Sequence, residues 1–441
     1  MNTTTACPAL FIAAPASGQG KTTIVAALAR LHTRLGRRVR VFKCGPDFLD
    51  PQIHRVAAGA DCYNLDLWMC GEADGAWRLA AAARESDLIL VEGVMGLYDG
   101  EPSGAEIAAR FGLPILAVIN GASMAATFGA IAHGLKHYRP GTNLVGALAN
   151  RVAGERHAEL LRAGLPADID WYGSLARDAD SALPERHLGL LPAGEIAELD
   201  ARLDRLADLL APTAAATLPP PLDFSRIAAS RAPAIAGLLA GRRIAVARDA
   251  AFCFLYPANL DCLRALGATL VFFSPLAGEA LPDCDAVWLP GGYPELHGER
   301  LAAQSALWSA LAAHVAAGKP LLAECGGMMT LFAGITDGDG RRHAMAGLLP
   351  GEIFMQRRLA ALGMCAARLP VAAGEATADD ELRGHSFHYS RAETPLTPFA
   401  RALRADGRPG EAIYRQQRLT ASYMHFYFPS NPRAAAQLFL P

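Results

Sequence analysis

A loop of small residues near the start of the chain has the composition of a phosphate-binding site, in the stretch FIAAPASGQGKTT at residues 11–23. Its two glycines allow backbone N–H groups to turn toward an anion, because no Cβ obstructs the approach. Lys21 can reach the β and γ phosphates of a nucleotide, and the Thr22 hydroxyl can ligate Mg²⁺. Pro15 stands where the strict pattern has glycine, so a chance Lys-Thr pair in a small-residue loop is the alternative. The residues expected to bind ATP are Ser17, Gly18, Gln19, Gly20, Lys21, Thr22 and Thr23.

Carboxylates follow two other apolar runs of the first half. Asp47 and Asp50 lie in the stretch DFLDP, where turn chemistry alone could explain both residues. Glu92 ends the apolar run LILVE and would be expensive to bury without a partner. A carboxylate at this place can bind Mg²⁺ opposite Lys21 and Thr22, directly or through water, whereas capping of the next helix is the alternative.

The stretch LLAECGGMM places Cys325 between a predicted buried strand and a predicted helix. Such a sharp turn exposes a nucleophile, and the helix N-terminus is expected to lower the pKa of the thiol. A lone cysteine is usually a small buried apolar side chain, but the other eight of the nine cysteines lack this setting. Upstream, the stretch PGGYPE at residues 290–295 offers backbone N–H groups that can hold an oxyanion.

A nucleophilic cysteine needs a base, and three of the twelve histidines compete for this role. His385 and His388 lie in GHSFHYS, which predicts a strand with both residues on one face. His425 ends an alternating apolar run near the C-terminus. The order of the predicted elements favours His425, because the last strand-end loop of such a sheet often returns to the site.

The elements that must position these residues are apolar runs alternating with helical patterns. The expected strands of the first half are residues 10–14, 39–43, 88–92, 115–120 and 144–150, and residues 22–34 form a helix. Continuous apolar strands separated by helices predict a parallel sheet covered on both faces. Ligands of such sheets lie at the carboxyl ends of the strands, where the polar residues of this chain gather.

A second α/β pattern begins at residue 242, after a run rich in Pro and Ala at residues 211–221. The fold class is therefore α/β with two domains. We expect a P-loop domain at residues 1–210, a linker at 211–240 and a second α/β domain at 241–441.

Composition narrows the classes of function. The 441 residues are 52% hydrophobic and 19% charged with a net charge of −2, which argues against a nucleic-acid partner. No secretory signal or membrane-spanning apolar run is expected, and no cysteine pair has the CxxC spacing of a zinc site. These features indicate a protein of the reducing cytoplasm with no membrane partner.

The C-terminal half resembles the class I glutamine amidotransferase domain, through PGGYPE, ECGG and a late His. The N-terminal half resembles the P-loop ligases of the dethiobiotin synthetase type. Nearly end to end, the chain is similar to the cobyrinic acid a,c-diamide synthase family, whose aerobic-pathway counterparts act on hydrogenobyrinic acid. The stretches that carry this likeness are FKCGPDFLDP, NLD, EGVMGLYDG, NRV and LPERHLGL.

The resemblance implies a ligase that uses ATP, Mg²⁺ and L-glutamine to amidate a corrinoid polycarboxylate. Cys325 would attack glutamine with His425 as its base, and Gly292 and Gly326 would form the oxyanion hole. Ammonia would pass to the first domain and react with acyl phosphates of the a and c carboxylates. The resemblance also suggests a homodimer. The other implied site residues are Thr22, Asp47 and Glu92 for the metal, Asn150 near the adenine, and Asp50, Leu97, Tyr98, Asp99 and Gly100 for the tetrapyrrole.

One departure concerns the base. Many class I amidotransferases carry Glu two residues after the catalytic His, whereas Tyr427 stands there in this chain. We therefore expect a Cys–His dyad, with a backbone carbonyl orienting His425.

Two other functions are compatible with parts of the pattern. One is amidation of another tetrapyrrole, such as Ni-sirohydrochlorin. The other is a P-loop ATPase switch with a non-catalytic C-terminal module, against which the intact ECGG turn argues, since a switch does not need a reactive thiol.

Overall fold

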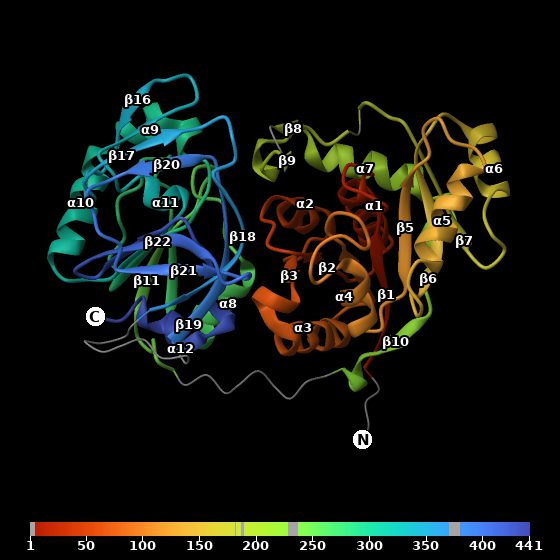
Figure 1. The fold of residues 1–441 in the computed structure, drawn as a ribbon, viewed down its shortest axis with the longest axis horizontal. Coiled ribbons are helices and arrows are strands. Elements are labelled where there is room, and N and C mark those ends of the chain that lie inside the picture. The colour runs from red at the N-terminus through yellow and green to blue at the C-terminus, as the bar shows by residue number, and fades with distance from the viewer. Residues whose placement is uncertain (1–4, 181, 187–188, 228–236, 370–379) are drawn as a thin grey trace. The chain divides into compact units, whose positions relative to one another are not determined.

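The computed structural model describes residues 5–180, 182–186, 189–227, 237–369 and 380–441. The chain divides into two compact units, Met1–Ala232 and Pro233–Pro441, each built around its own large sheet (Figure 1). Both units mix strands with helices, as the α/β expectation requires.

The sheet of the first unit is parallel, with the strand order β3-β2-β4-β1-β5-β6-β7. Because β1 lies in the middle of this order, the loop that follows it opens at the centre of the sheet edge. The strands are β1 (Ala6–Ala13), β2 (Val39–Cys44), β3 (Tyr63–Leu65), β4 (Leu88–Glu92), β5 (Ile115–Asn120), β6 (Leu144–Val152) and β7 (Asp170–Ala176).

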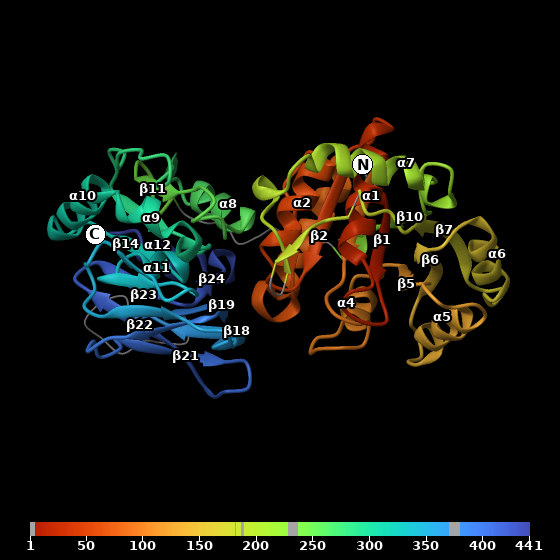
Figure 2. The ribbon, with the colours of Figure 1, turned by 90° about the horizontal axis from the view of Figure 1, so that it is seen from above.

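Helices cover both faces of this sheet (Figure 2). Alternate residues of β1 serve the two faces, since Phe11 packs toward α3, α4 and α5 whereas Ile12 packs toward α1, α2 and α7. The helices are α1 (Lys21–Arg34), α2 (Leu49–Ala58), α3 (Glu72–Glu85), α4 (Gly104–Arg110), α5 (Thr127–His137), α6 (Glu155–Ala163) and α7 (Leu199–Leu210), with a π-helical turn at Leu67–Gly71 before α3.

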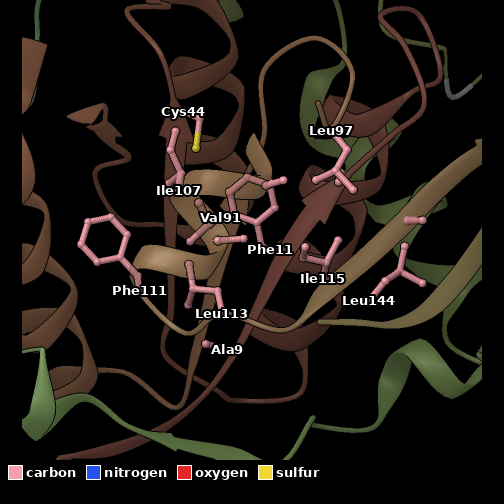
Figure 3. Packing of buried hydrophobic residues seen from close by; sticks show 14 of the residues in the cluster. Ala9, Phe11, Cys44, Val91, Leu97, Ile107, Phe111, Leu113, Ile115 and Leu144 are labelled. Carbon is pink, nitrogen blue, oxygen red and sulfur yellow. The ribbon is translucent and has the colours of Figure 1, made fainter. Parts of the chain in front are cut away.

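Figure 3 shows the core on the α4 side of the sheet, where Phe11 and Val91 from neighbouring strands meet Ile107 of α4. Leu97 belongs to this core and is almost fully buried. The parallel sheet covered on both faces was therefore predicted correctly from the apolar runs.

Residues that follow α7 remain packed on the first unit, although the sequence suggested a linker at 211–240. β10 (Pro221–Asp223) pairs with β1 in antiparallel orientation, and the Phe224 side chain is buried in the same core as Phe11. The run rich in Pro and Ala at residues 211–221 thus leads into an edge strand of the first unit. Residues 228–236 of the expected linker lie outside the described residues, as do His187 and Leu188 of the LPERHLGL stretch, which is flanked by the short strands β8 (Glu185–Arg186) and β9 (Gly189–Leu190).

The second unit has a large sheet whose described strands follow the order β12-β11-β13-β14-β23-β22-β21-β18-β19-β24. The first five of these are parallel, as expected for the runs after residue 242, and the remaining pairs are antiparallel. A smaller sheet has the order β16-β15-β17-β20.

The bounds of the strands in this unit are β11 (Arg243–Ala247), β12 (Thr269–Phe273), β13 (Ala286–Leu289), β14 (Leu321–Glu324), β15 (Gly334–Thr336), β16 (Arg342–Ala344), β17 (Glu352–Met355), β18 (Ala361–Arg368), β19 (Glu381–His388), β20 (Ser390–Glu393), β21 (Ala400–Arg404), β22 (Pro409–Gln416), β23 (Leu419–Ser422) and β24 (His425–Phe426). The helices are α8 (Pro257–Ala265), α9 (Gly298–Ala302), α10 (Ser305–Ala316), α11 (Gly326–Met329) and α12 (Pro432–Gln437). In the parts of the chain that the structure describes, every helix is too short or too polar to cross a bilayer.

Candidate active sites

The loop between β1 and α1 has the backbone conformation of an anion-binding turn. Gly20 adopts a left-handed conformation with φ of 92° and caps α1, and Gly18 also has a positive φ of 74°. A Cβ at Gly20 would lie only 2.1 Å from Nδ2 of Asn150, so a larger residue does not fit there. Ser17 and Gly18 are exposed at the tip of the loop, whereas Thr23 is half-buried in the first turn of α1. This geometry directs the N-terminus of a 14-residue helix toward the loop.

Two amide side chains brace the loop from neighbouring strands. Asn150, at the end of β6, donates from Nδ2 to the carbonyl oxygen of Gln19 over 2.8 Å. The Gln19 side chain in turn accepts a hydrogen bond from the backbone N–H of Asn120 over 2.8 Å. The structure therefore places Asn150 against the phosphate loop itself, and its amide group holds the loop in shape.

Lys21 is buried beneath the loop, where its ammonium group donates to the backbone carbonyls of Met95 at 2.5 Å and Ala16 at 3.3 Å. Burial, with a further contribution from the nearby charge of Lys43, lowers the pKa of Lys21 to about 8. An anionic phosphate bound in the loop would favour the charged form of this lysine.

Five polar side chains from β2, α1, α2 and β4 form one buried cluster. The Thr22 hydroxyl donates to Glu92 Oε1 at 2.8 Å and lies 3.2 Å from Asp50 Oδ2. Lys43 Nζ lies 2.7 Å from the same Asp50 oxygen and 2.8 Å from the same Glu92 oxygen. The second Glu92 oxygen is bonded to Nε2 of His54. Glu92 is thus fully buried, but both of its carboxylate oxygens have partners. These partners offset the free-energy cost of burying the carboxylate.

Charge sets the protonation of this cluster. Burial alone would raise the pKa of Glu92, but Lys43 and His54 hold it well below its usual range. Burial and the adjacent carboxylate of Asp50 raise the pKa of Asp47 to about 8. Glu92 is therefore an anion at neutral pH, whereas Asp47 holds a proton that an incoming cation could displace.

The donor set of the cluster fits Mg²⁺. Carboxylate and hydroxyl oxygens of Thr22, Asp50 and Glu92 lie together, and Mg²⁺ typically takes one or two carboxylates and completes its shell with phosphates and water. Within the described ranges no three His, Cys, Asp or Glu residues are arranged to hold a metal by themselves. Among the acidic residues of the DFLDP stretch, Asp50 is the one that touches Thr22, while Asp47 accepts from the backbone N–H of Leu49.

Residues 97–100 lie beside the phosphate loop but differ in orientation. Tyr98 and Asp99 line a pocket of about 460 Å³ together with Pro15 of the loop and Tyr138 and Arg139 that follow α5. Gly100 is exposed, whereas the side chain of Leu97 is almost fully buried in the core. Among residues 97–100, Tyr98 and Asp99 are thus the ones whose side chains are not buried in the core and line this pocket.

The second centre lies in the other unit, where β14 ends at Glu324 and α11 begins at Gly326. Cys325 occupies the turn between them with φ of 45° and ψ of −110°, a strained conformation for a residue with a Cβ. Its backbone N–H donates to the carbonyl oxygen of Ser422 on β23 over 2.7 Å. The predicted strand–Cys–helix turn is present, and the neighbouring strand holds it in place.

The two glycines expected to form an oxyanion hole lie side by side. A Cβ added to Gly326 would come within 3.0 Å of the backbone nitrogen of Gly292 and 2.8 Å of its carbonyl oxygen. Gly292 itself has a φ of 157° and leaves no room for a Cβ against Ala251. The backbones of the two glycines therefore lie against each other, and Gly326 directly follows Cys325 in the chain.

The expectation of a lowered thiol pKa is wrong for this structure. Cys325 is almost fully buried, and burial raises the pKa of its thiol far above the ordinary value, with Glu295 adding to the effect. α11 has only four residues, so its dipole is too weak to compensate. The resting sulfur is therefore a thiol, and a base must remove its proton when the substrate binds.

Of the three competing histidines, His425 is the one beside Cys325. The place that a Cβ would take at Gly291 lies 2.3 Å from Cε1 of His425 and 3.3 Å from Cβ of Cys325, so both side chains crowd against this glycine. Burial lowers the pKa of His425 well below its ordinary value, and the neighbouring His385 and His388 lower it further. The imidazole is therefore neutral and can accept a proton.

The expectation that His385 and His388 share a face of their strand is wrong, because residues three apart on a strand such as β19 point to opposite sides. The ring of His385 stacks on His425 with centroids 4.9 Å apart, whereas that of His388 stacks on Tyr423 at 3.7 Å. His388 also lies 3.2 Å from Glu411.

Glu324 fixes the short strand that carries His425. One carboxylate oxygen accepts from the backbone N–H of Phe426 at 2.8 Å, and the other accepts from Nε1 of Trp288 at 2.8 Å. Burial nevertheless raises the pKa of Glu324 to about 8. The residue directly before the nucleophile thus ties β24 to β13 and β14.

Sequence reasoning assigned no role to His54 or Glu324, and it named Gly291 only as part of the PGGYPE turn. His54 stands four residues after Asp50, and this one-turn spacing on a helix was a signal that both face the same cluster. Glu324 ends a wholly apolar strand, and the cost of burying its carboxylate pointed to a specific partner. No local signal marks Gly291, because its crowding arises between distant segments.

Both halves of the chain match known protein families. Residues 10–191 match the CobQ/CobB/MinD/ParA nucleotide binding domain, and residues 243–433 match the CobB/CobQ-like glutamine amidotransferase domain. The first unit is therefore a nucleotide-binding domain, and the second is a glutamine amidotransferase domain.

Several curated proteins are similar to the chain over nearly their whole length. A hydrogenobyrinate a,c-diamide synthase of Stutzerimonas stutzeri is 58% identical, over 99% of both chains. Another, of Pseudomonas aeruginosa, is 57% identical over 99% of this chain and 98% of the relative. A cobyrinate a,c-diamide synthase of Herminiimonas arsenicoxydans is 50% identical over 98% and 96%.

Proposed function

Since the chain belongs to the family of hydrogenobyrinate and cobyrinate a,c-diamide synthases, a group of glutamine-hydrolysing ligases, we propose that it amidates the a and c carboxylates of hydrogenobyrinic or cobyrinic acid. The product is the corresponding a,c-diamide of cobalamin biosynthesis. L-glutamine supplies the nitrogen and ATP supplies the driving force.

One observation carries this proposal beyond the likeness to relatives. A single chain holds a phosphate loop with a buried lysine and, in its other unit, a thiol beside a neutral imidazole and two converging glycines. A carboxylate is a poor electrophile and needs a phosphate as leaving group, whereas ammonia at neutral pH is mostly unreactive ammonium. Coupling the two centres removes both obstacles.

In the amidotransferase unit, the thiol proton of Cys325 passes to His425 as the sulfur attacks the amide carbon of glutamine. Backbone N–H groups of Gly292 and Gly326 hold the oxyanion of the tetrahedral intermediate. The carbon–nitrogen bond then breaks, and the nitrogen leaves as ammonia with the proton from His425. Water hydrolyses the remaining thioester to glutamate.

In the nucleotide-binding unit, a corrin carboxylate attacks the γ phosphorus of ATP and ADP leaves. Lys21 and the loop N–H groups hold the phosphates, with Ser17 and Gly18 at the tip. Ammonia displaces phosphate from the acyl phosphate and yields the amide. Tyr98 and Asp99 border the corrin, and Asn150 keeps the loop in its binding shape.

We further propose that Mg²⁺ is bound with the nucleotide by Thr22, Asp50 and Glu92, with Asp47 as a supporting group. When bound, the ion would neutralise phosphate charge. A cytoplasmic location fits nine cysteines without a disulfide. A homodimer is part of the proposal by analogy with the family alone.

The test uses two variants that each disable one centre. Cys325→Ala is expected to lose glutamine hydrolysis and glutamine-dependent amidation while amidation with added ammonium persists. Lys21→Ala is expected to lose amidation with either nitrogen source. The proposal is wrong if the wild-type protein releases no glutamate from glutamine, or if Cys325→Ala changes nothing. Parallel assays with hydrogenobyrinic and cobyrinic acid identify the preferred corrin.

A further inference from the structure

The sequence departs from many class I amidotransferases at one position close to its candidate base, His425. Tyr427 occupies the position two residues after His425, where a carboxylate stands in many related enzymes. It is fully buried, and its backbone N–H donates to the carbonyl oxygen of Arg383 over 2.7 Å. Its ring packs edge-on against Tyr256, with centroids 5.7 Å apart and an interplanar angle of 74°. The side chain at this position therefore supports a second tyrosine.

Tyr256 connects this support to a histidine. Its hydroxyl lies 2.9 Å from Nδ1 of His385, and both side chains are buried. The hydroxyl can donate to Nδ1 or accept from it, according to the tautomer of His385. In either case the hydrogen bond holds the orientation of this imidazole.

His385 lies directly against the catalytic base. β19 and β24 are antiparallel neighbours in which His385 and His425 are paired residues. Their rings stack with centroids 4.9 Å apart and an interplanar angle of 17°. The ring of Phe254 also packs against His425, with centroids 5.8 Å apart. The backbone of Gly291 packs against both His425 and Cys325 and leaves no room there for a side chain. The plane of His425 is thus set by packing on several sides.

The stack also suits the charge that His425 acquires. Burial lowers the pKa of His385 to about 3, so this ring stays neutral when its neighbour accepts the thiol proton. A neutral aromatic face beside a cation is attractive, whereas a second cation would repel it.

From this chain of contacts we propose that Tyr256 and His385 are positioning residues that orient His425. The proposal rests on the proposed glutaminase function. It assigns a role to His385, which the sequence offered only as a competing base.

Two variants test the hydrogen bond between Tyr256 and His385 separately from the packing of their rings. Tyr256→Phe keeps the ring that packs on Tyr427 and removes the hydroxyl, and His385→Phe keeps an aromatic ring against His425 and removes the nitrogen. Each is expected to lower kcat for glutamine hydrolysis about tenfold or more with KM for glutamine changed less than about twofold. Amidation with added ammonium should stay at the wild-type rate.

A matched control is His314→Phe, which removes a buried histidine of α10 whose ring nitrogen bonds the Pro320 carbonyl. It should leave kcat unchanged. The inference is overturned if Tyr256→Phe retains kcat within twofold, or if kcat and KM change together in Tyr256→Phe as general distortion would cause. If His385→Phe does not fold, the result for Tyr256→Phe decides the inference by itself. A wild-type protein without glutaminase activity would instead refute the proposed function.

Discussion

At the scale of single residues, burial shifts the pKa values of the two key side chains, Lys21 and Cys325, in opposite directions. Burial lowers the pKa of Lys21 and raises that of Cys325, so each group rests closer to its neutral form. At neutral pH Lys21 still carries its proton, and bound phosphate would favour that charged form further. The thiol of Cys325 stays protonated until a base accepts its proton.

The lowered pKa of Lys21 predicts how ATP binding depends on pH. In the free protein Lys21 loses its proton above a pKa of about 8, whereas bound phosphates favour the charged form. Binding therefore takes up a proton above pH 8, and ATP affinity should fall up to about tenfold per pH unit from there. Titration calorimetry without Mg²⁺ between pH 7 and pH 9.5 measures this. In Lys21→Arg, whose charge persists, affinity should stay level, and a level wild-type profile would contradict the prediction.

Gly291 gives a second prediction at this scale. A methyl group there would lie 2.3 Å from the His425 ring, so Gly291→Ala must displace the base. We expect glutamine hydrolysis to fall by at least about 100-fold, with ammonium-driven amidation unchanged. Gly338→Ala, in open space of the same unit, is the control and should behave as wild type. Full glutaminase activity in Gly291→Ala would show that the base lies elsewhere.

At the scale of elements, the sequence predicted those strands whose bounds are determined by a local pattern of apolar and polar residues. The strands at Leu88–Glu92 and Ile115–Asn120 match their expected bounds, because each is an uninterrupted apolar run closed by a polar residue. β10 was missed because a three-residue strand containing Pro221 has no periodicity of its own, and only its pairing with β1 defines it. The pKa of Cys325 was misjudged for a similar reason, since its burial comes from strands distant in sequence.

The position of β10 predicts where stability resides. Phe224 follows β10 and is buried in the first core, so Phe224→Ala should destabilise the first unit by about 3 to 5 kcal/mol. Urea unfolding measures this loss of stability. The transition of the first unit is the one whose midpoint rises when ATP is added, and Phe224→Ala should shift that midpoint to lower urea concentration. Phe399→Ala removes a largely exposed ring and should leave that transition in place. If the two variants behaved alike, residues after α7 would not belong to the first core.

At the scale of the whole molecule, the chain carries two units with different tasks, and the proposed reaction needs both. The likeness of each unit to its family explains how ATP or glutamine is handled separately. It does not explain why they share a chain. We propose that nitrogen released at Cys325 is consumed at a phosphorylated carboxyl in the other unit before it equilibrates with solvent.

The direct measurement is a competition between two nitrogen sources. Wild-type protein receives ATP, the corrin acid and glutamine labelled with ¹⁵N in its side-chain amide, in a solution of unlabelled ammonium, and mass spectrometry reads the label in the product. The account predicts predominantly ¹⁵N amides from the wild type and unlabelled amides from Cys325→Ala. Product whose label only mirrors the mixed ammonium pool would contradict it.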